Sequence, residues 1–196
     1  KKITAYHEAG HAILFHVLPD VGPVYSVSII PTGASAAGYT MPINENDEMF
    51  NTKGKMTQDI IVSLGGRVAE ELIFDDVTTG ASNDIKQATN LARNMVTKYG
   101  FSKNIGMIHY GDDEEEVFIG RDLAHAKNFS DSTAKLIDEE VKKIIDECYE
   151  KAKQHIIVST LNYNRFEINY YRAGKYLPSV SMLRYFSAFP TEMYYM

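Results

Sequence analysis

Apolar residues recur at helical spacing, three or four positions apart, in four parts of the chain. The first part ends at Pro19 and Gly22, which stop a helix, and the second begins at Thr57. Their apolar positions are Ala5, Ala9, Ala12, Ile13, Leu14 and Val17, and then Ile60, Ile61, Leu64, Val68, Leu72 and Ile73. Both patterns predict helices with one buried face.

The second half of the chain contains two more such patterns. Residues 78–83 supply capping side chains for a third helix, which we expect to end at Gly100. Ser130 or Asp131 caps a long fourth helix. The predicted buried positions are Ile85, Ala88, Leu91, Ala92, Met95, Val96 and Tyr99, and then Ile137, Val141, Ile144, Ile145, Cys148 and Ala152. Cys148 lies within this stripe, so we interpret it as a core residue and not as a reactive thiol.

Three short stretches predict strands. Residues 24–30 alternate and are rich in β-branched side chains, and residues 38–43 form a second candidate in which Pro42 suits an edge position. Residues 105–110 are a third candidate. An edge strand can bind an extended peptide through backbone hydrogen bonds, whereas the plainer interpretation is a hairpin with no binding role.

The second predicted helix contains two adjacent glycines, Gly65 and Gly66, and each costs a helix roughly 1 kcal/mol. They indicate either the close packing of another helix or a kink. Glu70 and Glu71 follow on the same helix. For these two carboxylates we favour a solvated, charged helix face over metal ligation.

The first predicted helix carries the sequence His-Glu-x-x-His at residues 7–11. His7 and His11 are four positions apart and therefore share one helix face, where two imidazoles can hold one zinc ion. Glu8 stands beside that face, where it can accept a proton from water. The plainer interpretation is two ordinary histidines on an amphipathic helix. His16 falls off this face, and we expect it in solvent.

A catalytic zinc usually has three protein ligands, so a third must follow downstream. Leu14 and Val17 stand where a metzincin would continue its motif, and no glutamate occurs between His11 and Glu45. The remaining candidates are Glu70, Glu71, Asp75, Asp76 and Asp84. Asp84 falls in the first turn of the third helix, where it either points back at the metal or only complements the helix dipole. Spacing alone does not decide between these two roles.

Length and composition fit a soluble globular chain with one domain, or one domain and a tail. The net charge of −6 argues against a nucleic-acid partner. A single cysteine cannot form an internal disulfide, and no apolar run is long enough to span a bilayer. The chain begins at Lys1 without an initiator methionine, so we expect a piece of a longer protein.

Several separate motifs, in one order, resemble the peptidase domain of the FtsH family. These are the ATP-dependent, membrane-anchored zinc proteases of bacteria, mitochondria and chloroplasts. The matching motifs are residues 4–12, 38–40, 65–71, 79–85, 88–96 and 120–123. The resemblance runs from Lys1 to about Lys153.

The resemblance implies a mainly helical peptidase bundle with a small β element. In the family, the histidine pair and the aspartate of the Asn-Asp-Ile stretch bind zinc, and they match His7, His11 and Asp84. The catalytic base of the family matches Glu8. The resemblance thus favours Asp84 as the third ligand over Glu70 and its neighbour.

The resemblance also implies how substrates and partners bind. The family docks peptide substrates on an edge strand that matches Gly38, Tyr39 and Thr40. It assembles as hexamers, on the cytoplasmic face of the inner membrane in bacteria. We therefore expect polypeptide substrates and a homo-oligomer for this chain.

Two features differ from the family. The AAA ATPase module and membrane anchors that precede the peptidase do not occur in this sequence, and neither does a phosphate-binding loop. We expect ATP use and membrane association to depend on such segments, and the chain alone to be soluble and cytoplasmic. Residues 1–154 are predicted to form the peptidase domain. Residues 155–196 contain ten of the 22 aromatic side chains and are predicted to be an atypical tail.

These observations predict a zinc-dependent endopeptidase domain that cleaves unfolded or membrane-extracted polypeptides, coupled in the family to an ATPase. The alternative is a non-catalytic fragment that serves only in oligomer assembly. A purely structural zinc site is a third possibility, but it needs a fourth ligand that the sequence does not show.

Overall fold

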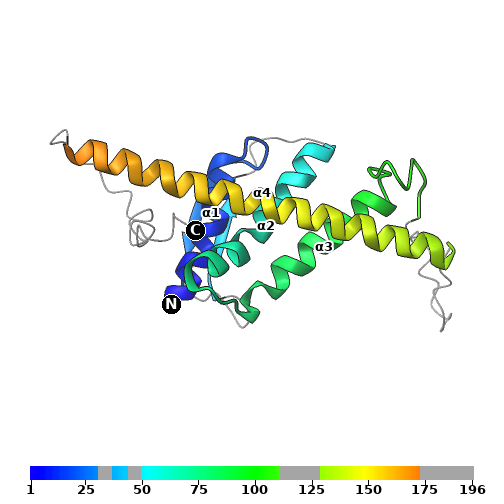
Figure 1. Ribbon diagram of the computed structural model, residues 1–196, viewed down its shortest axis with the longest axis horizontal. Helices are drawn as coiled ribbons and strands as arrows, with labels where there is room; N and C mark the ends of the chain where they lie inside the picture. The colour runs from blue at the N-terminus through cyan, green and yellow to red at the C-terminus, as the bar shows by residue number, and fades with distance from the viewer. Residues whose placement is uncertain (31–36, 44–49, 111–128, 173–196) are drawn as a thin grey trace.

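The computed structural model describes residues 1–30, 37–43, 50–110 and 129–172, with side chains described up to residue 161. The elements in chain order are α1 (Lys2–Val17), β1 (Val24–Ser28), β2 (Tyr39–Pro42), α2 (Lys53–Phe74), the short 3₁₀ turn η1 (Thr79–Ala81), α3 (Ser82–Thr97) and α4 (Asp131–Arg172). The predicted class, mainly helical with a small β element, is confirmed. Figure 1 shows α4 as one long helix lying across α1, α2 and α3.

Helix α2 packs against all three of the other helices. It lies close to α1, where a Cβ atom added to Gly10 would lie 2.3 Å from the carbonyl oxygen of Gly65. A Cβ atom on Gly65 would lie 2.6 Å from Leu14 Cδ1. Helix α2 continues unbroken from Lys53 to Phe74. The predicted close packing of another helix is therefore confirmed at Gly65.

The core lies between the four helices and contains most of the predicted apolar positions. Its fully buried side chains include Leu14, Ile60, Met95, Ile137 and Ile156. Ile85 and Tyr99, which we predicted to be buried, are exposed at the two ends of the α3 region. Cys148 is buried as predicted, and burial raises the pKa of its thiol to about 11.

Strands β1 and β2 form a two-stranded antiparallel sheet in which Val27 pairs with Thr40 and Ser28 with Tyr39. The sheet contacts α1. Both strands fall within the predicted ranges and are shorter. Because β2 pairs with β1 on one side, its other edge has no strand partner within the described part of the chain.

The predicted strand at residues 105–110 is wrong. The described backbone there is irregular, with Gly106 at a φ of +82°. The segment folds back on the end of α3, where the Tyr110 N–H donates to the Thr97 carbonyl over 2.8 Å. Ile105 is buried, but Met107 is 97% exposed and Ile108 is exposed as well, so the apolar residues of this stretch do not share one buried face.

One helix begins before its predicted start, and another crosses the predicted domain boundary. The Thr52 side chain caps α2 by accepting a hydrogen bond from the Lys55 N–H, so α2 begins before Thr57. Helix α4 continues past residue 154 to Arg172. The division at residue 154 stays a prediction. Residues 173–196 and the motif at residues 120–123 lie outside the described residues.

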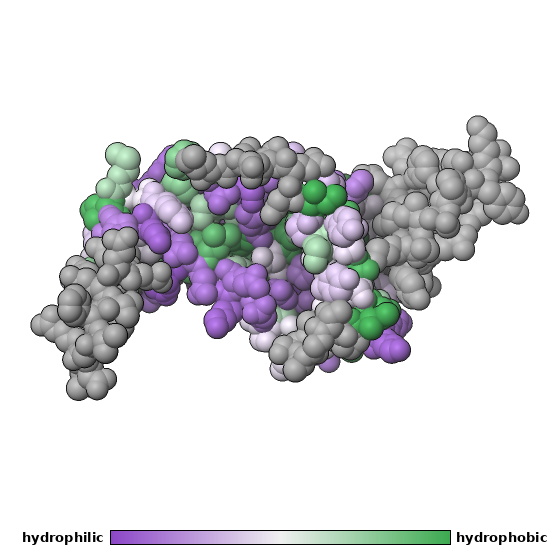
Figure 2. Space-filling model, turned by 180° about the vertical axis from the view of Figure 1, so that it is seen from behind, coloured by the Kyte–Doolittle hydropathy of each residue, from purple (hydrophilic) through white to green (hydrophobic). Residues whose placement is uncertain are grey.

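The surface seen from behind in Figure 2 is largely hydrophilic, with apolar side chains in separate groups. Among the described side chains, the most exposed large apolar ones are Met107, Phe50, Tyr25 and Ile30. Among the residues that the structure describes, no helix combines the length and the apolar composition needed to cross a bilayer.

Candidate active site

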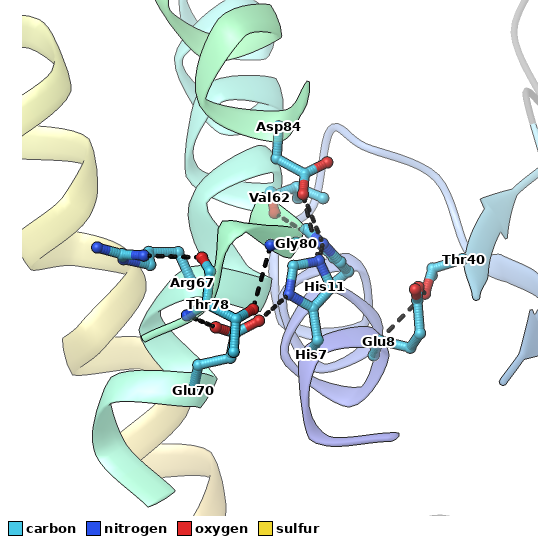
Figure 3. Close-up of polar contacts among 10 residues, drawn as sticks. All are labelled: His7, Glu8, His11, Thr40, Val62, Arg67, Glu70, Thr78, Gly80 and Asp84. Atoms are coloured by element: carbon cyan, nitrogen blue, oxygen red, sulfur yellow. Dashed lines mark hydrogen bonds and ion pairs between the residues drawn. The ribbon is translucent and has the colours of Figure 1, made fainter. Parts of the chain in front are cut away.

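Helix α1 and the first turn of α3 bring three potential metal ligands together, as Figure 3 shows. The Nε2 atoms of His7 and His11 are 3.1 Å apart. Asp84 Oδ2 lies 3.2 Å from the Nε2 atom of His7 and 3.9 Å from that of His11. These donor atoms all lie within 4.8 Å of one another, although 77 positions separate His7 from Asp84 in the sequence.

A backbone carbonyl sets the orientation of the His11 ring. Its Nδ1–H donates to the Val62 carbonyl over 2.7 Å, and a carbonyl can only accept. The Nε2 atom therefore presents its lone pair to the cluster. Burial lowers the pKa of His11, and the neighbouring His7 lowers it further, so the ring is held neutral.

A buried carboxylate orients the His7 ring in the same way. Its Nδ1 atom donates to Glu70 Oε1 over 2.8 Å, and the other oxygen of Glu70 accepts from the Thr78 N–H over 2.7 Å. Glu70 is 1% exposed. Burial by itself lowers the pKa of His7, but the carboxylates of Asp84 and Glu70 outweigh it and raise the pKa above its usual value. The local field therefore favours a positive charge at this ring.

The three donor atoms fit a zinc ion. When no proton occupies Nε2 of His7, two nitrogen lone pairs and a carboxylate oxygen face one another, and a cation between them removes the repulsion of these acceptors. Tetrahedral zinc with bonds of about 2.0–2.1 Å separates its ligand atoms by roughly 3.3 Å. The observed separations of 3.1, 3.2 and 3.9 Å are close to that value. A metal ion would compete with a proton for the Nε2 atom of His7.

Glu8 lies beside this cluster and points toward strand β2 (Figure 3). Its side chain is buried, with 6% exposure, and its Oε2 atom accepts a hydrogen bond from Thr40 Oγ1 over 2.8 Å. Burial raises the pKa of Glu8, while the Thr40 hydroxyl opposes that rise. A raised pKa makes a carboxylate a better proton acceptor, which suits a general base.

The predicted peptide-docking residues lie next to the same carboxylate. Gly38 and Thr40 contact Glu8, while Tyr39 pairs with Ser28 in the sheet. Their binding of a peptide stays a prediction. The expected exposure of His16 is confirmed.

The solvated position that we favoured for Glu70 is wrong, because this residue is buried between His7 and Thr78. A signal for it exists in the sequence: Glu70 follows Gly66 by one helical turn. A Cβ atom on Gly66 would lie 2.4 Å from the His7 ring, so the glycine leaves space for the imidazole that Glu70 holds.

The neighbouring carboxylate, Glu71, is half-buried and faces the long helix. It accepts hydrogen bonds from the Tyr149 hydroxyl and from Lys153 Nζ. The bond from Tyr149 lowers the pKa of Glu71, and Lys153 adds to the effect. Asp75 and Asp76 are exposed beyond the end of α2. Of the five acidic candidates, only Asp84 forms a group of potential metal ligands with both histidines in the described structure.

The fold and the cluster define a class of protein: a helical domain in which a His-Glu-x-x-His helix meets a distant aspartate. The family model of peptidase family M41 matches residues 1–165, and the chain belongs to this family. The match extends past Lys153, near which we expected the resemblance to end.

Named relatives agree with this assignment. The chain is 54% identical over 154 residues to the ATP-dependent zinc metalloprotease FtsH of Caldicellulosiruptor bescii, covering 79% of this chain and 25% of that protein. It is 50% identical over 169 residues to the FtsH of Ruminiclostridium cellulolyticum, covering 86% and 26%. It is 47% identical over 156 residues to the FtsH of Thermotoga maritima, covering 80% of this chain and 26% of that protein. The chain thus spans about a quarter of the length of these relatives.

Proposed function

We propose that this chain is a zinc-dependent endopeptidase domain. The observation that carries the proposal is the convergence of two oriented imidazoles and one carboxylate within 4.8 Å. Membership of peptidase family M41 and the names of the relatives support it.

His7, His11 and Asp84 would hold the zinc ion. When bound there, zinc polarises the scissile carbonyl and lowers the pKa of water. The Val62 carbonyl and the Glu70 carboxylate keep the two rings in the orientation that this role needs, since each holds the Nδ1 proton of one ring.

Glu8 would act as the general base. Its carboxylate accepts a proton from the attacking water and later donates it to the nitrogen of the leaving amine. Burial beside β2 favours this exchange because it raises the pKa of the carboxyl group.

Substrates would bind as extended polypeptides along strand β2, at Gly38, Tyr39 and Thr40. Backbone hydrogen bonds to a strand edge read little of the side-chain sequence, so we propose unfolded or membrane-extracted proteins as substrates. By analogy with the relatives, an ATPase module would deliver them, and the working assembly would be a homo-oligomer, a hexamer in the family. The cytoplasmic face of a bacterial inner membrane is the location that we propose.

The test is cleavage of a short unstructured peptide by the purified chain, measured together with its zinc content. Such a peptide needs no unfolding, so it tests the chemistry without an ATPase. We expect one zinc ion per chain and cleavage that stops on chelation. Glu8→Gln should keep the zinc and lose cleavage. A zinc-loaded oligomer without cleavage would instead support the assembly-fragment alternative, and cleavage by the Glu8→Gln variant would overturn the mechanism.

A further inference from the structure

The hydroxyl group of Thr40 bonds directly to the side chain of Glu8, across 32 positions of sequence. Thr40 Oγ1 lies 2.8 Å from Glu8 Oε2 and 3.2 Å from the Glu8 carbonyl oxygen. A hydroxyl has one hydrogen to donate, and a bond to an ionised carboxylate is shorter and stronger than one to a neutral acceptor. The carboxylate is therefore the main partner.

Gly38 defines the environment of the second carboxylate oxygen. A Cβ atom at this position would lie 2.7 Å from Glu8 Oε1 and 2.6 Å from the Ser28 carbonyl oxygen. The absence of a side chain at Gly38 leaves space beside Oε1. One oxygen of the carboxylate is thus bonded to the strand, and the other faces a position that only glycine keeps open.

Tertiary contacts hold Thr40 in this place. It pairs with Val27 of β1, and the end of β2 is fixed by the Ile43 N–H, which donates to the Pro23 carbonyl over 2.8 Å. The sheet also packs on α1. The bond to Glu8 therefore links a fixed strand to the side chain of the proposed base.

We propose that Thr40 is a positioning residue for the general base, a role that rests on the proposed function. Its hydroxyl fixes Oε2, and Oε1 is left to accept the proton from water. That transfer forms a neutral carboxyl group, and the same proton then moves to the amine nitrogen, which restores the carboxylate. The Thr40 hydroxyl keeps its own hydrogen throughout. The Thr40 side chain thus acts through Glu8, whereas the peptide binding predicted for Gly38, Tyr39 and Thr40 uses the backbone of the strand.

Two matched pairs of variants isolate the hydroxyl. The first pair is wild type and Thr40→Val, whose side chains are nearly isosteric and differ in the hydroxyl group. The second pair is Thr40→Ser and Thr40→Ala, which both lack the methyl group and also differ in the hydroxyl group. In each pair we expect loss of the hydroxyl to lower kcat for a short peptide roughly 10- to 100-fold, because the base is misplaced. KM should change less than about twofold, because substrate binding is untouched. Thr40→Ser should recover most of the kcat that Thr40→Ala loses, and zinc content should be equal in all four.

Crystal structures of the same four proteins supply a readout that is independent of activity. We expect Glu8 Oε2 within hydrogen-bonding distance of the hydroxyl in wild type and Thr40→Ser. In Thr40→Val and Thr40→Ala the carboxylate should leave this position.

The outcomes separate this inference from the proposed function. A rise in KM with unchanged kcat would show that Thr40 binds substrate, and the inference would be overturned. If Glu8 does not move in the two variants without a hydroxyl, the inference is overturned as well. This structural result does not depend on cleavage. If the wild-type chain cleaves no peptide, that result counts against the proposed function alone. If Thr40→Val does not fold, the serine and alanine pair decides.

Discussion

His7 and Glu70 are joined by a 2.8 Å hydrogen bond from Nδ1 to Oε1, across 63 positions of sequence. Glu70 also accepts from the Thr78 N–H, so one carboxylate links the histidine helix to the segment that leads into α3 and Asp84. Glu70 thus orients the proposed ligand His7 and also helps to place the start of α3, which carries the proposed ligand Asp84.

The first prediction concerns this carboxylate. Glu70→Ala should lower zinc affinity about 10- to 100-fold, because the His7 ring loses the acceptor that fixes its orientation. Glu71→Ala is the matched control, since Glu71 is adjacent in sequence but bonds to Tyr149 and Lys153 instead. Competition with a zinc-binding dye measures both. Equal zinc affinities for the two variants would contradict the role of Glu70.

The second prediction uses two glycines of the same helix. In Gly66→Ala the new methyl group would lie 2.4 Å from the His7 ring, so the ring must move. We expect loss of zinc binding and a lower free energy of unfolding, by on the order of 1–3 kcal/mol. Gly54→Ala is the control, because its Cβ atom would meet Thr52 Oγ1 only at 3.6 Å. Urea unfolding should show Gly54→Ala to be as stable as wild type or up to about 1 kcal/mol more stable.

The third prediction concerns removal of zinc. A ligand present at a hundred times its Kd stabilises the folded state by about 2.7 kcal/mol. For a domain of this size, 1 kcal/mol shifts Tm by roughly 2–4 °C. Chelation should therefore lower Tm by roughly 5–10 °C.

The control for this experiment is a pair of histidine variants measured by calorimetry. His11→Ala should remove the response to the chelator, whereas His16→Ala should keep it, because His16 is exposed and away from the cluster. A wild-type Tm that does not respond to chelation would argue against a bound metal.

The fourth prediction is a pH dependence at a site away from the cluster. Glu140 is buried and accepts hydrogen bonds from Ser102 Oγ and Asn104 Nδ2, each over 2.6 Å. The bond from Ser102 lowers the pKa of Glu140 below its ordinary value of 4.5, and Asn104 adds to this effect. Because the folded pKa is the lower one, the stabilisation is complete above pH 4.5 and is lost as the pH falls through the folded pKa.

Glu140→Gln should therefore lower the free energy of unfolding at pH 7 by on the order of 1–2 kcal/mol. The difference in the free energy of unfolding between this variant and wild type should shrink as the pH falls below the ordinary pKa of a glutamate. Denaturant unfolding of the chelated protein across pH 3–7 measures it. Glu139→Gln is the control. Glu139 is exposed, and its Oε1 atom lies 3.8 Å from Lys135 Nζ in a surface ion pair. An equal loss at pH 7 and at the acid end would show that packing, rather than charge, stabilises this contact.

The sequence by itself determined the helices and the histidine pair. Helical periodicity is a local property, and so is the four-residue spacing that sets His7 and His11 one above the other. The close packing at Gly65 was also open to prediction, since glycine in a helix interior needs a compensating contact. Asp84 was selected as the third metal ligand by the resemblance to the family. Its position in the first turn of a helix suited a metal ligand and a residue that complements the helix dipole equally well.

Only the tertiary structure decided which polar side chains face the cluster. Glu70 and Glu71 are neighbours on one helix, yet the first is 1% exposed and the second is half-buried against α4. Helical position separates their directions, but nothing local says which direction leads to His7. The bond between Thr40 and Glu8 and the irregular segment at residues 105–110 have the same origin. Contacts between residues far apart in the chain depend on how whole elements pack together. The residue spacing within a single helix or strand does not determine that packing.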